Sequence, residues 1–200
     1  MRKTVFDTPV VSHVLYAVSW LFLRLTGWRK GGSPPDLPKF VLIGAPHTSN
    51  WDFIFCIAFA FVYRRKIFWM GKSSLFRFPY GPMFRWMGGI PIERSKPHGV
   101  VGQTIETFNS TDRLILCIAP EGARKRVEKW KTGFYHVACG AGVPIALGFL
   151  DYKQRRGGFG PLFTPTGDID ADTIQIRAFY ATITGRHPNQ FSTPEAKNRD

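Results

Sequence analysis

The sequence predicts an α/β fold: a single layered domain with a mixed, mostly parallel sheet flanked by helices, plus an N-terminal amphipathic or hydrophobic helix. Short apolar runs alternate along the chain with segments whose apolar residues recur at helical spacing, which is typical of layered α/β domains. The 200 residues are enough for one domain with a substantial core. With 44% hydrophobic and 20% charged residues, the composition excludes an intrinsically disordered chain.

Residues 1–30 are expected to form an N-terminal helix that associates with a membrane. An apolar run covers residues 9–23 and has basic residues on both sides, at Arg2, Lys3 and Arg24. A helix needs about 20 apolar residues to cross the hydrocarbon core, so this run is short for a span. Two interpretations stay open: a helix that lies on the membrane surface, and a first helix that packs into the core.

Apolar runs bounded by turn residues are expected to form the strands of the sheet. They cover residues 39–44, 67–70, 90–92, 113–119 and 143–150. Helical spacing predicts helices at residues 53–63, 98–108, 132–139 and about 170–183, and a helical region broken by turns at residues 71–89. In the last helix, Asp170 is the expected N-cap and Asp172 lies in the first turn, where the helix dipole favours a negative charge.

Glycine, proline and polar residues indicate the boundaries of the globular domain. Residues 31–38 are expected to be a linker or turn, so the domain is placed at residues 39–184. A glycine-rich turn is expected at Gly157 and Gly158, after the last apolar run. Residues 185–200 are expected to form a polar, frayed tail.

The chain is strongly basic, with 27 Lys and Arg against 14 Asp and Glu and a formal charge of +13. Such a charge indicates an anionic partner: nucleic acid, an anionic membrane surface or a phosphorylated small molecule. The aromatic share of 15% is high and favours apolar surface that meets lipid or a partner. The odd number of cysteines, three, all in apolar contexts, excludes a disulfide framework.

Several classes of site lack their motifs in this sequence. There is no glycine-rich loop of the G-x-x-x-x-G-K or G-x-G-x-x-G kind, and no G-x-S-x-G around a nucleophilic serine. The histidines and cysteines have no spacing typical of a zinc site, so no metal is expected. No RNP-like or helix-turn-helix signature accompanies the charge, which argues against nucleic acid as the partner.

A histidine and an aspartate follow the first predicted domain strand, in the segment HTSNWD. On one helix their side chains would diverge by about 140°, but they can meet if His47 lies in the strand-to-helix loop and Asp52 in the first helical turn. Asp52 would then orient the imidazole, and the other ring nitrogen could act as a general base. The alternative is a purely structural role, because Ser49 and Asp52 also match an S-x-x-D capping box.

Three further blocks lie near the ends of predicted strands, where layered α/β sheets commonly bind ligands. EGAR, which begins at Glu121, follows the most hydrophobic strand. Within it, Gly122 permits a close backbone approach, and Arg124 offers a fork of donors for phosphate. GIPIER ends another strand at Arg94, and VPIAL begins a strand at Val143.

Taken together and in this order, HTSNWD, GIPIER, EGAR and VPIAL resemble the motif blocks of the glycerophospholipid acyltransferase family, the 1-acyl-glycerol-3-phosphate acyltransferases. The resemblance implies direct transfer of a fatty acyl group from acyl-CoA or acyl carrier protein to a lysophospholipid hydroxyl, without an acyl-enzyme and without a cofactor. His47 would be the general base, with Asp52 behind it. The sequence departs from the family pattern at Ala123, where threonine is usual, and at Pro46, where asparagine often stands.

The resemblance also implies which residues bind the acceptor. Arg94 and Arg124 match positions associated with its phosphate, and Lys72 in GKSSLF matches more loosely. Glu121, beside Gly122, would hold the EGAR loop or orient acceptor hydroxyls.

We expect a peripheral or monotopic protein on the cytoplasmic face of an anionic membrane. The alternatives are an acyltransferase for another lysolipid or an aminolipid, and a non-catalytic basic membrane-binding module.

Overall fold

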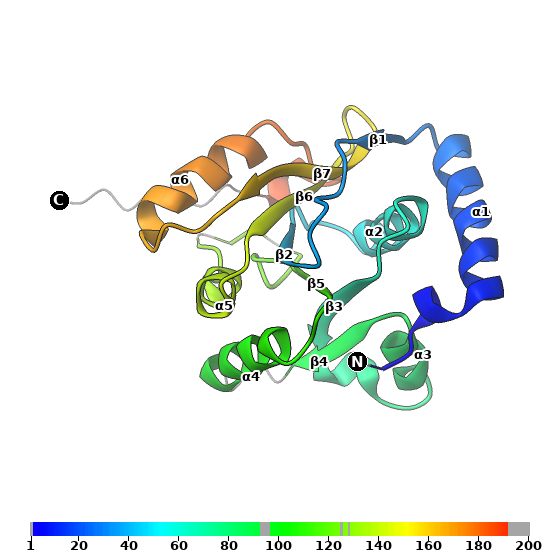
Figure 1. Cartoon of the computed structure of the whole chain (residues 1–200). Coiled ribbons are helices and arrows are strands. Elements are labelled where there is room, and N and C mark those ends of the chain that lie inside the picture. The colour runs from blue at the N-terminus through cyan, green and yellow to red at the C-terminus, as the bar shows by residue number, and fades with distance from the viewer. Residues whose placement is uncertain (1, 93–96, 125, 128, 192–200) are drawn as a thin grey trace.

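A seven-stranded sheet forms the middle layer of the part of the chain that the computed structural model describes, residues 2–92, 97–124, 126–127 and 129–191 (Figure 1). The strands lie in the order β1 (Arg29–Gly31), β7 (Arg156–Phe163), β6 (Ile145–Asp151), β2 (Lys39–Gly44), β5 (Leu114–Ile118), β3 (Ile67–Lys72) and β4 (Gly89–Ile92). Neighbouring strands run parallel, except for the antiparallel pair β6 and β7. The α/β class with a mixed, mostly parallel sheet is confirmed.

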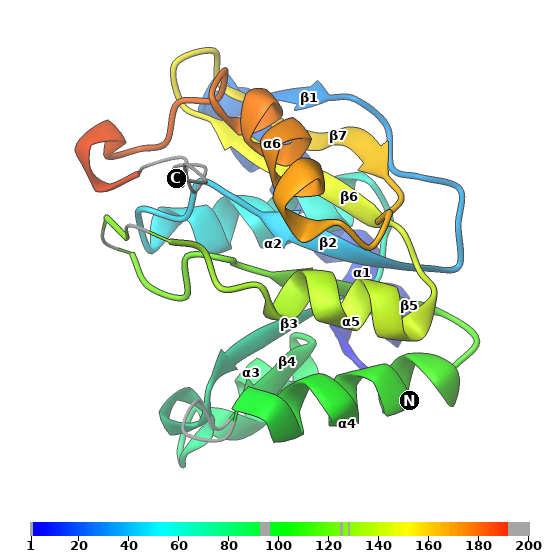
Figure 2. The same ribbon diagram turned by 90° about the vertical axis from the view of Figure 1, so that its left-hand side faces the viewer.

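Helices cover both faces of this sheet (Figure 2). One face carries α1 (Pro9–Leu25) and α2 (Trp51–Val62), and the opposite face carries α4 (Pro97–Asn109), α5 (Gly133–Ala141) and α6 (Ile169–Tyr180). The short helix α3 (Gly81–Trp86) contacts β4 at the edge of the sheet. The elements η1 (Val5–Asp7), η2 (Ser73–Phe76) and η3 (Pro188–Gln190) are short 3-10 helices.

The central strands β2 and β5 are buried on both faces, as expected for a parallel sheet covered on each side. Phe40 and Val41 of β2 and Leu116 of β5 belong to this core. Val41 pairs with Leu116 on one side and with Ile145 of β6 on the other. This register brings the carboxyl ends of neighbouring strands to one edge of the sheet, where ligands of such folds usually bind.

α1 lies against α2, and its two sides differ. On the inner side Leu23 is buried, and Trp28, just after the helix, packs on Phe55 of α2 with 4.3 Å between ring centroids. On the outer side an apolar stripe is exposed, formed by Val10, Val14, Val18, Leu21 and Leu25. Within the described residues, no helix combines the length and apolar character needed to cross a membrane. α1 therefore has features of both interpretations of the N-terminal segment: one side packs in the core, and the other presents apolar residues outward.

The structure corrects the expected turn at Gly157 and Gly158, because both glycines lie inside β7. A Cβ at Gly158 would come within 2.2 Å of the carbonyl oxygen of Gly31, and a Cβ at Gly157 within 2.3 Å of the Phe59 ring. These glycines therefore allow β1 and α2 to approach β7 closely, which is the other common reason for glycine in a strand. The edge strand β1 itself was not expected from the sequence, and the turn before β7 lies at residues 152–155.

The N-cap of α6 is Asp168, so the expectation for Asp170 is wrong. The Asp168 carboxylate accepts from the N–H groups of Asp170 and Ala171, each at 3.1 Å, and the extended backbone of Asp168 suits a cap. The helix also ends at Tyr180, before residue 183. Asp172 lies in the first turn as expected, and it is buried.

Candidate active site

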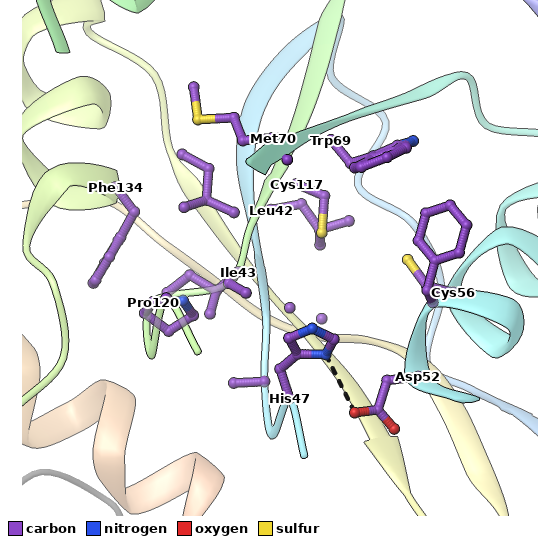
Figure 3. Close-up of a pocket in the computed structure, with 18 of the residues that line it drawn as sticks. Leu42, Ile43, His47, Asp52, Cys56, Trp69, Met70, Cys117, Pro120 and Phe134 are labelled. Atoms are coloured by element: carbon purple, nitrogen blue, oxygen red, sulfur yellow. Dashed lines mark ion pairs between the residues drawn. The ribbon is translucent and has the colours of Figure 1, made fainter. Parts of the chain in front are cut away.

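His47 and Asp52 meet at the carboxyl end of β2, where the chain passes into α2. His47 lies in the loop after the strand, and Asp52 lies in the first turn of the helix. His47 Nδ1 is 3.2 Å from Asp52 Oδ2 (Figure 3). The Asp52 side chain is buried, whereas 27% of the His47 side chain is exposed. This is the arrangement that the sequence required for contact between the two side chains.

The Asp52 carboxylate is the hydrogen-bonding centre of the loop. Its Oδ2 also accepts from the N–H groups of Thr48 (2.7 Å) and Ser49 (2.8 Å), and its Oδ1 accepts from the Tyr152 hydroxyl (2.6 Å). Burial by itself would raise the pKa of Asp52, but hydrogen bonds from His47, Tyr152 and Ser49 outweigh it and lower the pKa. The carboxylate is therefore charged at neutral pH.

The N-cap of α2 is Asn50, without a side-chain cap hydrogen bond, so the capping box expected to begin at Ser49 is not formed. The Asp52 carboxylate instead closes the loop before α2, through the N–H groups of Thr48 and Ser49, and also faces the imidazole.

Glu121 joins the EGAR loop to the HTSNWD loop. Its Oε1 accepts a hydrogen bond from the His47 N–H at 2.9 Å. The side chain is buried, burial raises its pKa, and within the described part of the chain its Oε2 has no hydrogen-bond partner. Glu121 thus holds the main chain of the histidine from the end of the neighbouring strand β5.

The other residues predicted to bind the acceptor lie at separate points of the same sheet edge. Gly122 has a left-handed φ of +65°, which glycine adopts without strain, and it turns the chain after β5. Arg124 is exposed and donates to Oδ1 of Asn50, the residue before α2. Lys72 is exposed at the end of β3. Arg94 lies outside the described residues.

His47, Asp52, Lys72 and Arg124 line one cavity of about 1440 Å³. Its polar lining includes His47, Asn50, Asp52, Lys72, Gly122, Arg124 and Lys131. Its apolar lining includes Leu42, Cys56, Trp69, Met70, Cys117 and Phe134, several of which surround His47 in Figure 3. Among the described residues, no His, Cys, Asp or Glu side chains are grouped so as to hold a metal ion. The cavity therefore combines a histidine, cationic groups and a large apolar surface, which suits an amphiphile with an anionic head.

Tyr152 is a site residue that the sequence did not indicate. It follows β6 and lies 100 positions from Asp52 along the chain. A tyrosine after an apolar run carries no functional signal by itself. Its contact with Asp52 depends on β6 lying next to β2 in the sheet.

The beginning of the expected polar tail lies against the site, so the expectation of fraying is wrong for residues 185–191. The His187 N–H donates to the Thr48 hydroxyl at 3.2 Å. With its amide nitrogen turned toward them, Gln190 donates to the carbonyl oxygens of Thr48 (3.0 Å) and Arg124 (2.9 Å). Residues 185–191 thus form hydrogen bonds with both the HTSNWD loop and the EGAR loop, and they connect the two loops.

Comparison with known proteins relates this chain to lipid acyltransferases. Over 117 residues it is 31% identical to the 1-acyl-sn-glycerol-3-phosphate acyltransferase of Haemophilus influenzae, covering 55% of this chain and 47% of that protein. Over 108 residues it is 31% identical to the Escherichia coli protein of the same name, covering 50% of this chain and 42% of that protein. The chain thus spans about half the length of these relatives.

A solved structure has a similar fold. The crystal structure of the 1-acyl-sn-glycerophosphate (LPA) acyltransferase PlsC from Thermotoga maritima superposes with a TM-score of 0.56 at 15% identity, over 88% of this chain and 82% of that one. The model of the acyltransferase family matches residues 35–146, more than half of the chain and the part that contains HTSNWD, GIPIER and EGAR. This chain belongs to the acyltransferase family.

Proposed function

We propose that this protein moves a fatty acyl group from an acyl thioester, acyl-CoA or acyl carrier protein, to a hydroxyl of a lysophospholipid such as 1-acyl-glycerol-3-phosphate. The observation that carries the proposal is the His47–Asp52 contact on the wall of a large apolar cavity that also holds cationic side chains. The names of the relatives support the same acceptor. No acyl-enzyme is needed, because the histidine can activate the acceptor directly.

In this mechanism His47 is the general base. Asp52 accepts from Nδ1–H and thereby keeps the proton on that nitrogen. Figure 3 draws the other ring nitrogen turned away from Asp52 and toward the cavity. That nitrogen takes the proton of the acceptor hydroxyl as the oxygen attacks the thioester carbonyl. The thiolate then leaves with the proton from His47, and the new ester and the free thiol are the products.

The acceptor's phosphate is proposed to bind among the cations at the cavity. Arg124, Lys131 and Lys72 line it and are exposed. Arg124 is next to Asn50 at the start of α2, where the helix dipole also favours an anion. By the family resemblance Arg94 joins this group. The acyl chain of the donor or acceptor is proposed to lie along the apolar lining of the same cavity.

The protein is proposed to act at the cytoplasmic face of an anionic membrane. The exposed stripe of α1 supplies aliphatic side chains, and the segment around α3 exposes Leu75, Phe78, Tyr80, Met83 and Trp86. Arg77 and Arg85 lie in the same segment. Apolar side chains flanked by basic ones suit a peripheral or monotopic contact, in which each Lys or Arg near an anionic surface contributes about 1 kcal/mol.

The reaction is tested by thiol release from acyl-CoA and acyl carrier protein with a panel of lysolipids in detergent. Turnover that requires 1-acyl-glycerol-3-phosphate, and that falls by about 10²–10⁴ in His47→Ala, is the expected result. His13→Ala is the matched control, because His13 is exposed on α1. Release without any acceptor would indicate a thioesterase, preference for another lysolipid or an aminolipid would change the acceptor, and no turnover would leave a basic membrane-binding module.

The membrane contact is tested with a triple substitution of Val10, Val14 and Val18 by Gln. These side chains are exposed, so the fold should be kept while co-sedimentation with anionic vesicles falls. Ile174→Gln, an exposed position on α6, is the control that should still sediment. Deletion of residues 1–30 would test membrane contact less specifically than the triple substitution, because it also removes α1, the packing partner of α2. Unchanged sedimentation of the triple variant would place the contact elsewhere.

A further inference from the structure

The two oxygens of the Asp52 carboxylate have different partners. Oδ2 faces His47 Nδ1 and also accepts from the N–H groups of Thr48 and Ser49. Oδ1 accepts from the Tyr152 hydroxyl at 2.6 Å, its one donor in the described part of the chain. The terminal torsion of an aspartate is broad, so a donor on Oδ1 restricts the rotation that would carry Oδ2 away from the imidazole.

Tyr152 is itself held on several sides. Its ring packs edge-on against Trp28, with 4.9 Å between centroids, and against Phe55, with 5.9 Å. Its N–H donates to the carbonyl oxygen of Thr184 at 2.9 Å, and the Arg186 guanidinium lies 5.9 Å from the ring. Burial and the neighbouring carboxylate raise the pKa of Tyr152, so its hydroxyl stays protonated and able to donate at neutral pH.

We infer that Tyr152 is a positioning residue of the His47–Asp52 pair: its hydroxyl holds the carboxylate so that His47 keeps its proton on Nδ1 and presents Nε2 to the acceptor. This inference rests on the proposed function. Tyr152 is not among the residues that line the cavity, and its hydroxyl reaches the site through Asp52. It lies outside the four motif blocks and outside residues 35–146, which match the family model.

The competing explanation is that Tyr152 only contributes to stability, and the chain contains a matched pair for testing it. Tyr135 donates to Asp172 Oδ2 at 2.7 Å, a hydrogen bond of the same chemistry to another buried aspartate. The pair joins α5 to α6. The Tyr135 hydroxyl also accepts from the Gly167 N–H at 3.0 Å. Tyr135→Phe therefore lowers stability at least as much as Tyr152→Phe, without disturbing His47.

The kinetic experiment compares the wild type, Tyr152→Phe and Tyr135→Phe with acyl-CoA and 1-acyl-glycerol-3-phosphate. We expect kcat of Tyr152→Phe to fall roughly tenfold, the effect of losing one hydrogen bond to a charged group, with KM for both substrates unchanged. Tyr135→Phe should lower Tm at least as much as Tyr152→Phe and keep the wild-type kcat. Equal kcat for the two variants would overturn the inference and leave Tyr152 a stabilising residue.

A second measurement does not depend on turnover. The ring ¹⁵N chemical shifts of His47 report which nitrogen carries the proton. In the wild type and in Tyr135→Phe we expect the Nδ1–H form, and in Tyr152→Phe a mixture with the Nε2–H form. The same tautomer in all three proteins would overturn the positioning role. If the wild type shows no acyl transfer but the tautomer still changes in Tyr152→Phe, the proposed function fails while the positioning role stands.

Discussion

Replacement of Asp52 by asparagine separates the charge of the carboxylate from its shape. The amide oxygen can still accept from the N–H groups of Thr48 and Ser49, which both reach Oδ2 in the wild type. The amide nitrogen then takes the place of Oδ1, where the Tyr152 hydroxyl can turn and accept. The same amide oxygen still faces His47 Nδ1 and can accept from its N–H, but His47 loses the negative charge that stabilises its protonated form during the reaction.

The expected effects on stability and on catalysis differ in size. A hydrogen bond to a charged group contributes about 1 kcal/mol more than a neutral one, and the Asp52 carboxylate accepts three besides the contact with His47. A neutral amide costs less to bury, which offsets part of this difference, so the free energy of unfolding should fall by about 2 kcal/mol. Domains of this size are stable by about 5–15 kcal/mol, so the variant stays folded. In contrast, kcat should fall by about 10²–10⁴.

Asp172→Asn is the matched control for this prediction. Asp172 is also buried, and it accepts from the Tyr135 hydroxyl and from the Thr166 N–H, each at 2.7 Å. Urea unfolding should show a similar decrease in the free energy of unfolding for both variants. Steady-state kinetics should show a lower kcat for Asp52→Asn alone. A variant Asp52→Asn with reduced stability and the wild-type kcat would refute the dyad and leave the carboxylate a purely structural role in the loop before α2.

Three further outcomes are expected. The folded-state pKa of Asp52 is lowered, so its charge stabilises the fold above the unfolded pKa of about 4, and this contribution is lost as pH falls through the folded pKa. The free energy of unfolding, measured with urea at about pH 7 and pH 3, should therefore fall less on acidification in Asp52→Asn than in the wild type. Gly122→Ala, at φ +65°, should cost about 1 kcal/mol of stability and reduce turnover, whereas Gly142→Ala, at φ +61° with open space around its Cβ, should cost the same and keep turnover. Arg124→Gln should raise KM roughly tenfold for a phosphate-bearing acceptor and leave a neutral monoacylglycerol unaffected; equal losses for both acceptors would make this arginine structural.

Local patterns in the sequence were sufficient for the strands β2 to β6 and for the central pair of the candidate site, but not for β1 and β7. The apolar runs that became β2, β3, β5 and β6 are buried on both faces, so their composition alone marks them as strands. His47 and Asp52 lie close together in the chain, and a strand-to-helix loop between them leaves few ways to avoid contact.

The errors arose where one residue type serves two purposes. The glycine pair Gly157 and Gly158 predicts a turn, but in the structure it provides close approach within β7, and only the neighbouring Gly31 and Phe59 distinguish the two uses. Asp168 and Asp170 are equally good caps in sequence. The backbone before α6 decides between them, because only Asp168 is extended.

Only the tertiary structure decided which distant parts of the chain support the His47–Asp52 pair. Glu121 reaches the His47 N–H across 74 positions, Tyr152 reaches Asp52 across 100, and His187 reaches Thr48 across 139. Each contact exists because β5 and β6 flank β2 in the sheet, or because the chain after α6 returns across the same edge. Strand order depends on the burial of whole faces and leaves no mark on single residues such as Tyr152. The sequence therefore determined the chemistry of the site, while the sheet order determined the surroundings that orient it.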